Sequence, residues 1–410
     1  MRPLLINLLI VLGLLLSGSA YAGTCKTPKN PKEKFVLASE PVSYTRKSPT
    51  NRIEEVLSKR KTINVFKAWT WQKQNYENYG LQWNVNGIPF SKNYFNAIEI
   101  RWNYAYPLNG TYPGIKKYLT KRNWGHDKEY GKTLAINLKS KDYSDYLLNV
   151  IKKLNTNIVD GILLDWWHNR HKNSGGYSEK IVKNFRIELA KKIQTEFGND
   201  FLIIGNVNWD RDTGTHNYIN GVFMELYKNP YKYTGGYNCK EIRLMGELLK
   251  FHDQNLREPR IIAFEPWRIT KKLSKEKVYE LSGKTENDKI DLEYLEKIYR
   301  RNFRSSDENI RFAKLFTAMA MVIPENGYIL YADNNPDNPK GDHDHDFYDF
   351  YNTDLGKETS IGMEISEGLG FKMYEKGVIV YNYTLERYKI KFTNQKEVTI
   401  DPLEGMFVEF

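Results

Sequence analysis

Eight short strand-like runs, several of them separated by helix-like runs, constrain the fold of this chain more than any other feature of its sequence. The helix-like runs carry apolar residues at helical spacing, as in EKIVKNFRIELAKKIQTEF and NIRFAKLFTAMAMVI. This order predicts an α/β fold, namely a (β/α)₈ (TIM) barrel, although no helix pattern separates the first two strands. The predicted strands are TINVFKAW (62–69), FNAIEIRWNY (95–104), KTLAINL (132–138), IVDGILLDW (158–166), FLIIGNVN (201–208), NGVFMELY (220–227), RIIAFEPW (260–267) and GYILYAD (327–333).

Polar residues gather on one face of several of these strands, toward the C-terminal end. Glu225 alternates with Phe223 and Gly221, opposite an apolar face. Asn206 and Asn208 likewise share one face of their predicted strand. In a barrel, the face that carries these polar residues points inward. The C-terminal ends of the strands form the mouth, where active sites lie. Further polar residues in this pattern are Glu99, Arg101, Asn103 and Asn137.

The fourth predicted strand ends in a carboxylate against aromatic rings. Asp165 shares a face with Leu163 and Gly161 and is followed by Trp166, Trp167 and His168. A carboxylate beside aromatic rings at the top of a barrel strand is typical of glycosidases, which need one protonated and one ionised carboxyl group around the scissile bond. The alternative is that Asp165 only caps the following loop by accepting backbone amides.

Two glutamates are candidate partners for Asp165. Glu225 closes the sixth strand and Glu265 closes the seventh. We predict that Glu225 is the proton donor, because Phe223 and nearby tyrosines should desolvate it and keep it protonated near neutrality. Asp165 is then the nucleophile or the base. A structural salt bridge with Arg101 is the alternative for either glutamate, and the sequence does not decide between Glu225 and Glu265.

A set of aromatic and polar residues around this mouth is predicted to bind the substrate. The tryptophans would stack on sugar faces, and the amides would bind hydroxyl groups. Any one tryptophan can equally belong to the core. The candidates are Trp69, Arg101, Asn103, Asn137, Trp166, Trp167, His168, Asn206, Asn208 and Trp267, with Trp209 as a further stacking platform.

VDGILLDWW, followed by GVFMELY, resembles the secreted barrel glycosidases related to the endo-α-1,4-polygalactosaminidases. Their fourth strand reads Asp-Gly-x-x-x-Asp and their sixth ends in a glutamate. DFYNTDLGKETS and MYEKGVIVYN are similar to their passage into a C-terminal β domain. The resemblance, best over 132–227 and 345–383, implies glycoside hydrolysis with Asp165 and Glu225 as the catalytic carboxylates. The double tryptophan and the loop HNRHKNSGGY depart from the family pattern, which leaves the sugar open.

A cluster of histidines and aspartates, GDHDHDFYD (341–349), offers an alternative chemistry. Its residues 342–346, which include His343 and His345, hold metal-ligating types, and a metal-dependent hydrolase is the corresponding hypothesis. The glycoside hydrolase hypothesis needs no metal or cofactor. A third hypothesis is a catalytically inactive glycan-binding protein on the same barrel. The linkage cleaved, the stereochemistry and the choice between endo and exo action stay open.

The first residues predict export. One basic residue, an apolar run and the pattern Ala20-Tyr21-Ala22 form a signal peptide, so the mature chain is expected to start at Gly23 in a secreted or periplasmic protein. Lipidation of Cys25 is a weaker alternative. No later run is long enough for a membrane span. An oxidising compartment allows a disulfide between Cys25 and Cys239, but two free thiols remain the alternative.

The predicted organisation is a signal peptide (1–22), an N-terminal extension (23–60), a barrel (61–355) and a small antiparallel β domain (360–410). Residues of the last segment alternate in short runs without a helix pattern. The net charge of +11 is spread over helices. It indicates a solvated basic surface, or association with an acidic glycan or cell surface. Nucleic acid is not expected as a partner, because no binding motif accompanies the charge. The expected partner is a polysaccharide or oligosaccharide substrate.

Overall fold

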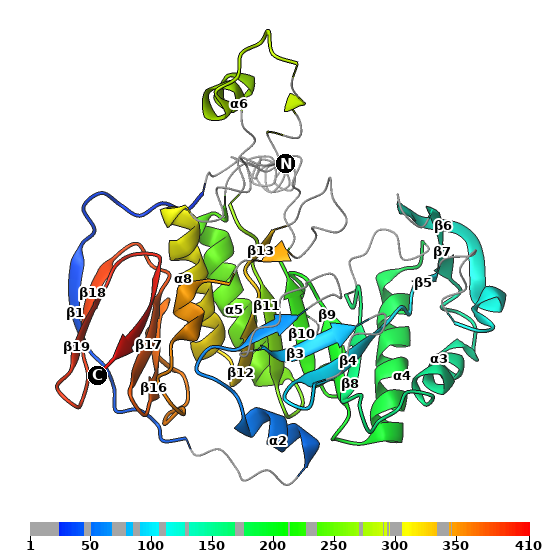
Figure 1. Cartoon of the computed structure of the whole chain (residues 1–410). Coiled ribbons are helices and arrows are strands. Elements are labelled where there is room, and N and C mark those ends of the chain that lie inside the picture. Colours follow the sequence, from blue (N-terminus) through cyan, green and yellow to red (C-terminus); the bar gives the residue numbers. More distant parts are fainter. Residues whose placement is uncertain are drawn as a thin grey trace, which may run out of the picture.

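A computed structural model gives the fold (Figure 1). It describes residues 24–44, 51–67, 79–84, 91–105, 112–127, 131–168, 176–211, 214–226, 236–269, 274–289, 291–292, 295, 306–333, 344–345 and 347–410. None of the helices within these ranges is long and apolar enough to cross a membrane.

Eight parallel strands close into a barrel, which confirms the predicted fold class. Pairing of β12 with β2, Ile329 opposite Val65, completes the ring. The strands follow one another around it as β2 (Val65–Lys67), β3 (Tyr79–Asn84), β4 (Phe95–Ile100), β8 (Gly161–Leu164), β9 (Leu202–Asn206), β10 (Gly221–Glu225), β11 (Ile261–Glu265) and β12 (Asn326–Ile329).

The prediction of one barrel strand was wrong. KTLAINL forms β7 (Gly131–Ile136), which lies outside the barrel in a small antiparallel sheet with β5 (Tyr104–Ala105) and β6 (Leu119–Asp127). The missing barrel strand is β3, whose Leu81 and Trp83 face the barrel interior. Alternation of apolar residues marks any half-buried strand, so it cannot separate a barrel strand from a hairpin strand. The 3₁₀ helix η1 (Ile115–Tyr118) precedes β6.

The strand residues alternate between two apolar clusters, as period-two geometry requires. Residues such as Phe223, Leu163 and Ile204 fill the barrel interior. Their neighbours, such as Met224 and Leu164, pack outward under the helices. Gly161 is an inward position that only glycine can fill, because an added Cβ would lie 2.2 Å from the Leu202 carbonyl oxygen.

The predicted helices cover the barrel. The periodic runs of the sequence become α3 (Tyr143–Ile151), α4 (Glu179–Phe197), α5 (Cys239–Asn255) and α8 (Asp307–Val322). α5 begins with a complete capping box between Asn238 and Glu241. α6 (Lys275–Ser282) stands apart from the body on the side of the C-terminal strand ends (Figure 1). Short elements near the mouth are β13 (Ala332–Asp333), β14 (Asp344–His345) and η4 (Asp349–Asn352).

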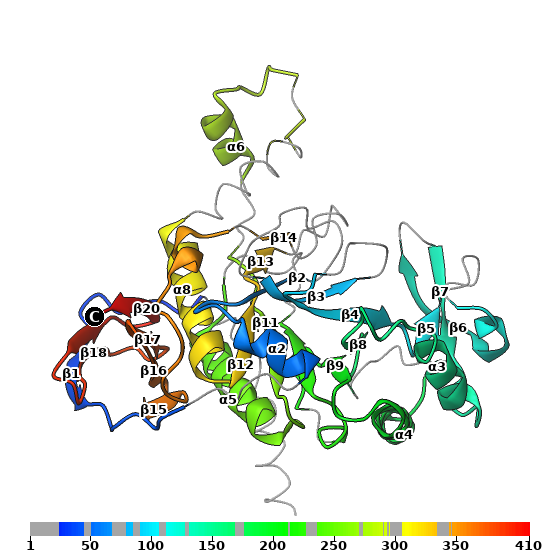
Figure 2. The same ribbon diagram turned by 60° about the horizontal axis from the view of Figure 1, so that its bottom comes forward.

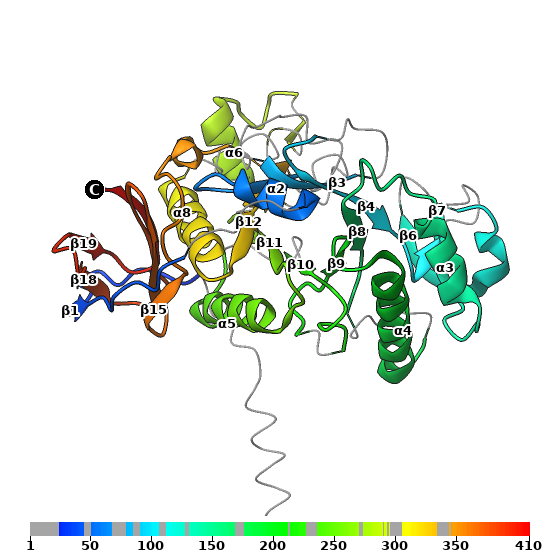
Figure 3. The ribbon, with the colours of Figure 1, turned by 90° about the horizontal axis from the view of Figure 1, so that it is seen from below.

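Helix α2 (Arg52–Ser58) lies across the N-terminal end of the barrel (Figure 3). Its Ile53 and Val56 are buried in the same cluster as the barrel interior. Arg52 Nε lies 2.8 Å from Asp160 Oδ1, and Asp160 Oδ2 accepts the Asn96 N–H at 2.8 Å. Asp160, the first aspartate of the fourth-strand motif, therefore fastens this helix to the barrel.

An antiparallel β domain follows the barrel, as predicted, and packs beside α8 (Figure 2). The sequence did not reveal that β1 (Glu33–Leu37), in the N-terminal extension, joins this domain by pairing in parallel with β18. Its own strands are β15 (Met363–Ser366), β16 (Leu369–Tyr374), β17 (Gly377–Asn382), β18 (Arg387–Lys391), β19 (Glu397–Ile400) and β20 (Glu404–Glu409).

A disulfide joins Cys25 to Cys239, with the two Cα atoms 4.8 Å apart. The sequence left this pairing open. The bond ties the N-terminal arm to the first residue of α5, and the backbone adds a hydrogen bond from the Cys25 N–H to the Tyr237 carbonyl at 2.9 Å.

We expect the double substitution Cys25→Ser and Cys239→Ser to lower the free energy of unfolding by about 2–5 kcal/mol, because the bond closes a loop across 214 residues. Urea unfolding with and without a reducing agent measures this. The reducing agent should destabilise the wild type and leave the double variant unchanged. Equal unfolding curves for both proteins would contradict the prediction.

Candidate active site

The C-terminal ends of three neighbouring strands bring together two carboxylates and an amide. Asp165 follows β8, Asn206 ends β9 and Glu225 ends β10. Each has the parity of an inward residue, because Leu163, Ile204 and Phe223, two positions earlier, belong to the interior cluster. Asp165 and Glu225 are half-buried, whereas Asn206 is buried.

The side-chain amide of Asn206 bridges the two carboxylates. Its Nδ2 donates to Asp165 Oδ1 and to Glu225 Oε2, at 2.9 Å in each case. Its Oδ1 accepts the Asn208 N–H at 3.3 Å, which orients the amide with nitrogen toward the carboxylates. With both hydrogen bonds linear, the angle of about 120° between the two N–H bonds of an amide corresponds to about 5 Å between the accepting oxygens.

The backbone around Asp165 is held from two sides. Asp165 Oδ1 also accepts the Trp166 N–H at 2.8 Å, and its carbonyl accepts Nε1–H of the buried Trp102 at 2.6 Å. Trp166 has a φ of 52° and Asn208 a φ of 51°. A left-handed conformation is costly for a bulky residue such as tryptophan, whereas asparagine adopts it more readily. Both flank the carboxylate pair.

Glu265 lies beside Glu225 but differs in exposure. The two residues are register partners on β10 and β11, and the Leu226 N–H donates to the Glu265 carbonyl at 3.1 Å. Glu265 is 0 % exposed, whereas Glu225 is half-buried. Of the two glutamates, Glu225 is thus the one that solvent or a ligand reaches directly.

A second charged pair lies next to this group. Arg101 Nε lies 3.3 Å from Glu99 Oε1, and the guanidinium is 5.7 Å from the Tyr104 ring centre. The Arg101 N–H donates to the hydroxyl of Tyr112, whose pKa burial raises to about 12. The sequence placed Glu99 on the inward face without assigning it a role. Its alternation with Ala97 was the available signal.

Lys67, at the end of β2, was missed entirely. It is buried, and burial lowers the pKa of its ammonium group. Only three residues of its strand are regular, so no alternation marked it in the sequence.

His168 and Asn208 lie next to each other at the rim. The His168 Nε2 atom is 3.3 Å from Asn208 Nδ2, and the ring centre of His168 is 5.9 Å from that of Trp166. Trp166 and Trp209 are half-buried, which suits a stacking role. Besides Arg101, four predicted residues are therefore near the carboxylate pair: Trp166, His168, Asn206 and Asn208.

Two predicted stacking tryptophans lie in the core instead. Trp167 is 0 % exposed, bonds Thr215 through Nε1 and fills space that Gly205 leaves on β9. Trp267 is also buried in the cluster under the helices. The sequence could not show this, because residues that follow the end of a strand no longer alternate between its two faces.

Two further predicted residues, Asn137 and Asn103, do not join the site, and a third lies where the structure gives no description. Asn137 follows β7 in the outer sheet, is exposed, and accepts a hydrogen bond from the Tyr177 hydroxyl. Asn103 is buried next to the same sheet, where its carbonyl accepts the Ile136 N–H. Trp69 lies outside the described residues.

The histidine–aspartate cluster at 342–346 lies largely outside the described residues as well. Asp344 and His345 form β14, paired with β13. Within the described part of the chain, no group of three or more His, Cys, Asp or Glu side chains is arranged to hold a metal ion.

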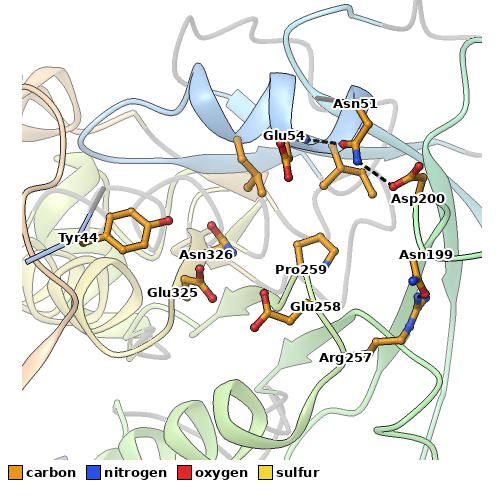
Figure 4. Close-up of a pocket in the computed structure, with 12 residues that line it drawn as sticks. Tyr44, Asn51, Glu54, Asn199, Asp200, Arg257, Glu258, Pro259, Glu325 and Asn326 are labelled. Carbon is orange, nitrogen blue, oxygen red and sulfur yellow. Dashed lines mark hydrogen bonds between the residues drawn. The ribbon is translucent and has the colours of Figure 1, made fainter. Parts of the chain in front are cut away.

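A cavity of about 500 Å³ opens at the opposite end of the barrel (Figure 4). Asn51 and Asp200, joined by a 3.0 Å hydrogen bond, line one side, and Glu325 and Asn326 line another. Burial raises the pKa of Glu325. This end carries the starts of β9 and β12, whereas active sites of such barrels lie at the C-terminal ends of the strands, so this cavity is not the candidate site.

No protein-family model matches the chain, and no curated protein sequence matches it. Among solved structures, the glycoside hydrolase domain of PelA from Pseudomonas aeruginosa is similar with a TM-score of 0.36 and 8% identity, over 54% of this chain and 90% of that chain. Ega3 from Aspergillus fumigatus, in complex with galactosamine, has a TM-score of 0.36 and 10% identity, over 53% and 83%. An alpha-amylase from Lactobacillus plantarum has a TM-score of 0.45 and 7% identity, over 87% and 100%. The strand pairing of this chain, not these similarities, establishes its fold.

Proposed function

We propose that this protein is a secreted glycoside hydrolase that cleaves a glycan with retention of configuration, using Asp165 and Glu225. The observation that carries the proposal is the Asn206 amide, which holds both carboxylates at 2.9 Å. The resulting separation of about 5 Å between facing oxygens suits a retaining pair, whereas inverting enzymes need about 6.5–9.5 Å between the two carboxyl groups.

Asp165 is the nucleophile in this proposal. Two N–H groups, from Trp166 and Asn206, donate to the same oxygen of its carboxylate. The Asn206 bond is common to both carboxylates, so the Trp166 N–H is the donor that favours the ionised form at Asp165 over Glu225. In the first step, an Asp165 oxygen forms a bond to the anomeric carbon while the bond to the leaving oxygen breaks.

Glu225 is the general acid and then the base. It stands above the fully buried Phe223 ring, which removes water from one side of the carboxyl group. It protonates the leaving oxygen in the first step. In the second step it takes a proton from the water that cleaves the ester to Asp165, and both residues return to their starting states.

The rim supplies groups that suit a sugar. The half-buried rings of Trp166 and Trp209 offer stacking faces, and Asn208 and His168 offer polar groups for hydroxyls. We propose a polysaccharide or oligosaccharide substrate. The family resemblance makes polymers that contain galactosamine one part of the screen, measured by release of reducing ends.

Replacing Asp165 by Asn should lower kcat on the order of 10³–10⁴-fold and leave glycan affinity nearly unchanged, because the amide keeps the shape and loses the nucleophile. Asp160→Asn is the matched control from the other end of β8. It should destabilise the fold by about 1–3 kcal/mol and leave kcat of the folded protein within a few-fold. Assays of turnover, binding and urea unfolding measure the three quantities.

Unchanged function in Asp165→Asn would favour the hypothesis of a catalytically inactive glycan-binding protein. Loss of wild-type turnover in EDTA, restored by a divalent ion, would favour the metal-dependent hydrolase.

Glu225→Gln should lose about 10²–10⁴-fold in kcat/KM on the natural polymer and far less on an activated aryl glycoside, which needs little protonation. Glu265→Gln is the matched variant one strand away. NMR of the first-formed product should show retention. If Glu265→Gln carries the leaving-group-dependent defect and Glu225→Gln stays near wild type, the proton donor is on β11.

Export is proposed from the signal peptide, and the disulfide supports cleavage after Ala22 over lipidation, since it uses the thiol that a lipid would modify. N-terminal sequencing of the exported protein should begin at Gly23. A mature chain that starts at a lipidated Cys25 would contradict this.

A further inference from the structure

Tyr237 connects the ends of the two strands that carry the glutamates. Its side chain is 2 % exposed. The hydroxyl donates to the Leu226 carbonyl at 3.0 Å and accepts the Trp267 N–H at 2.6 Å. Leu226 directly follows Glu225, and Trp267 comes two residues after Glu265. One hydroxyl group therefore bridges the segments that follow the two strands, at the point where both segments leave the barrel.

This hydroxyl acts where the regular ladder between the strands stops. The last ladder bond runs from the Leu226 N–H to the Glu265 carbonyl at 3.1 Å. Beyond it, a regular ladder would join the Trp267 N–H to the Leu226 carbonyl. Here each of these groups bonds the Tyr237 hydroxyl instead. Both residues are buried, so water does not readily replace the lost partner if the hydroxyl is removed.

Tyr237 is itself held on several sides. Its ring meets those of Trp209 and Phe316 edge-on, with ring centres 5.8 Å apart in each case. Its carbonyl accepts the Cys25 N–H at 2.9 Å, and the Cys25–Cys239 disulfide closes two residues further on.

The N-terminal arm also packs against the preceding residue. A Cβ added to Gly236 would lie 2.8 Å from the side chains of both Thr24 and Ile269. The arm and the start of α5 thus leave the tyrosine little freedom to move.

We propose that Tyr237 is a positioning residue for the carboxylate pair, held in place by the N-terminal arm and the disulfide. Its hydroxyl fixes the backbone directly after β10, and thereby the position of the Glu225 side chain relative to Asn206 and Asp165. The inference rests on the proposed function for its catalytic part. Its structural part, the coupling of the two strand ends, stands independently of turnover.

The first test is Tyr237→Phe, which keeps the ring and removes only the hydroxyl. We expect kcat to fall about 10–100-fold with KM within about two-fold, because a small misplacement of a reacting group costs rate more than binding. The pH-rate limb assigned to the proton donor should shift. Tyr388→Phe is the control, since its hydroxyl bonds Glu386 in the β domain at 3.0 Å and its side chain is 5 % exposed.

A double-mutant cycle asks whether Tyr237 acts through Glu225. In a Glu225→Gln background, Tyr237→Phe should change kcat by less than about two-fold. Additive effects, or an unchanged kcat in Tyr237→Phe itself, would overturn the positioning role.

Amide hydrogen exchange separates this inference from the proposed function. In Tyr237→Phe, exchange at Trp267 should become at least about ten-fold faster, while exchange in Tyr388→Phe should match wild type there. If wild type cleaves no glycan, the proposed function fails, and exchange alone decides whether Tyr237 couples the strand ends. Unchanged exchange at Trp267 would overturn that coupling.

Discussion

Closure of the barrel is the constraint on which the rest of the structure depends. A closed ring admits only every second strand residue, and the interior is filled by large side chains such as Phe66, Trp83 and Phe223. Beyond the last of these large side chains, the next inward-facing residue has no apolar side chain above it. In several strands this residue is polar. β9 lies between β8 and β10, with Asn206 opposite Phe223 in the register. An amide on the middle strand can therefore reach the carboxylates of both neighbours, and the site follows from strand order.

The two aspartates of the fourth-strand motif belong to opposite ends of that ring. Asp160 binds Arg52 and the Asn96 N–H at the end covered by α2, while Asp165 lies at the open mouth. The left-handed conformations of Trp166 and Asn208 also lie at the mouth. The helix anchor and the candidate site are thus separated by a strand of four regular residues, so changes at one end need not disturb the other.

Sequence reasoning was accurate for the helices and for the two faces of a strand, and it failed on which strands belong to the barrel. It located α4 from nineteen residues of helical spacing, and it placed Asp165, Asn206 and Glu225 on inward faces from simple alternation. It took β7 for a barrel strand and missed β3, because alternation describes burial on one face and not the identity of the partner strand. Trp167 and Tyr237 lie outside regular strands, where no period predicts direction. Their roles depend on contacts between segments far apart in the sequence, which no local pattern encodes.

The pairing of β1 with β18 has a consequence for the order in which the molecule is built. A ribosome makes residues 33–37 long before residues 387–391, their partners in the sheet. Cys25 likewise waits for Cys239. The arm around Cys25 can dock once residue 239 exists, whereas β1 has no partner strand until nearly all of the chain has been made. Residues 33–37 therefore stay without their partner strand during most of synthesis, and only a chain that extends to residue 391 can complete this sheet.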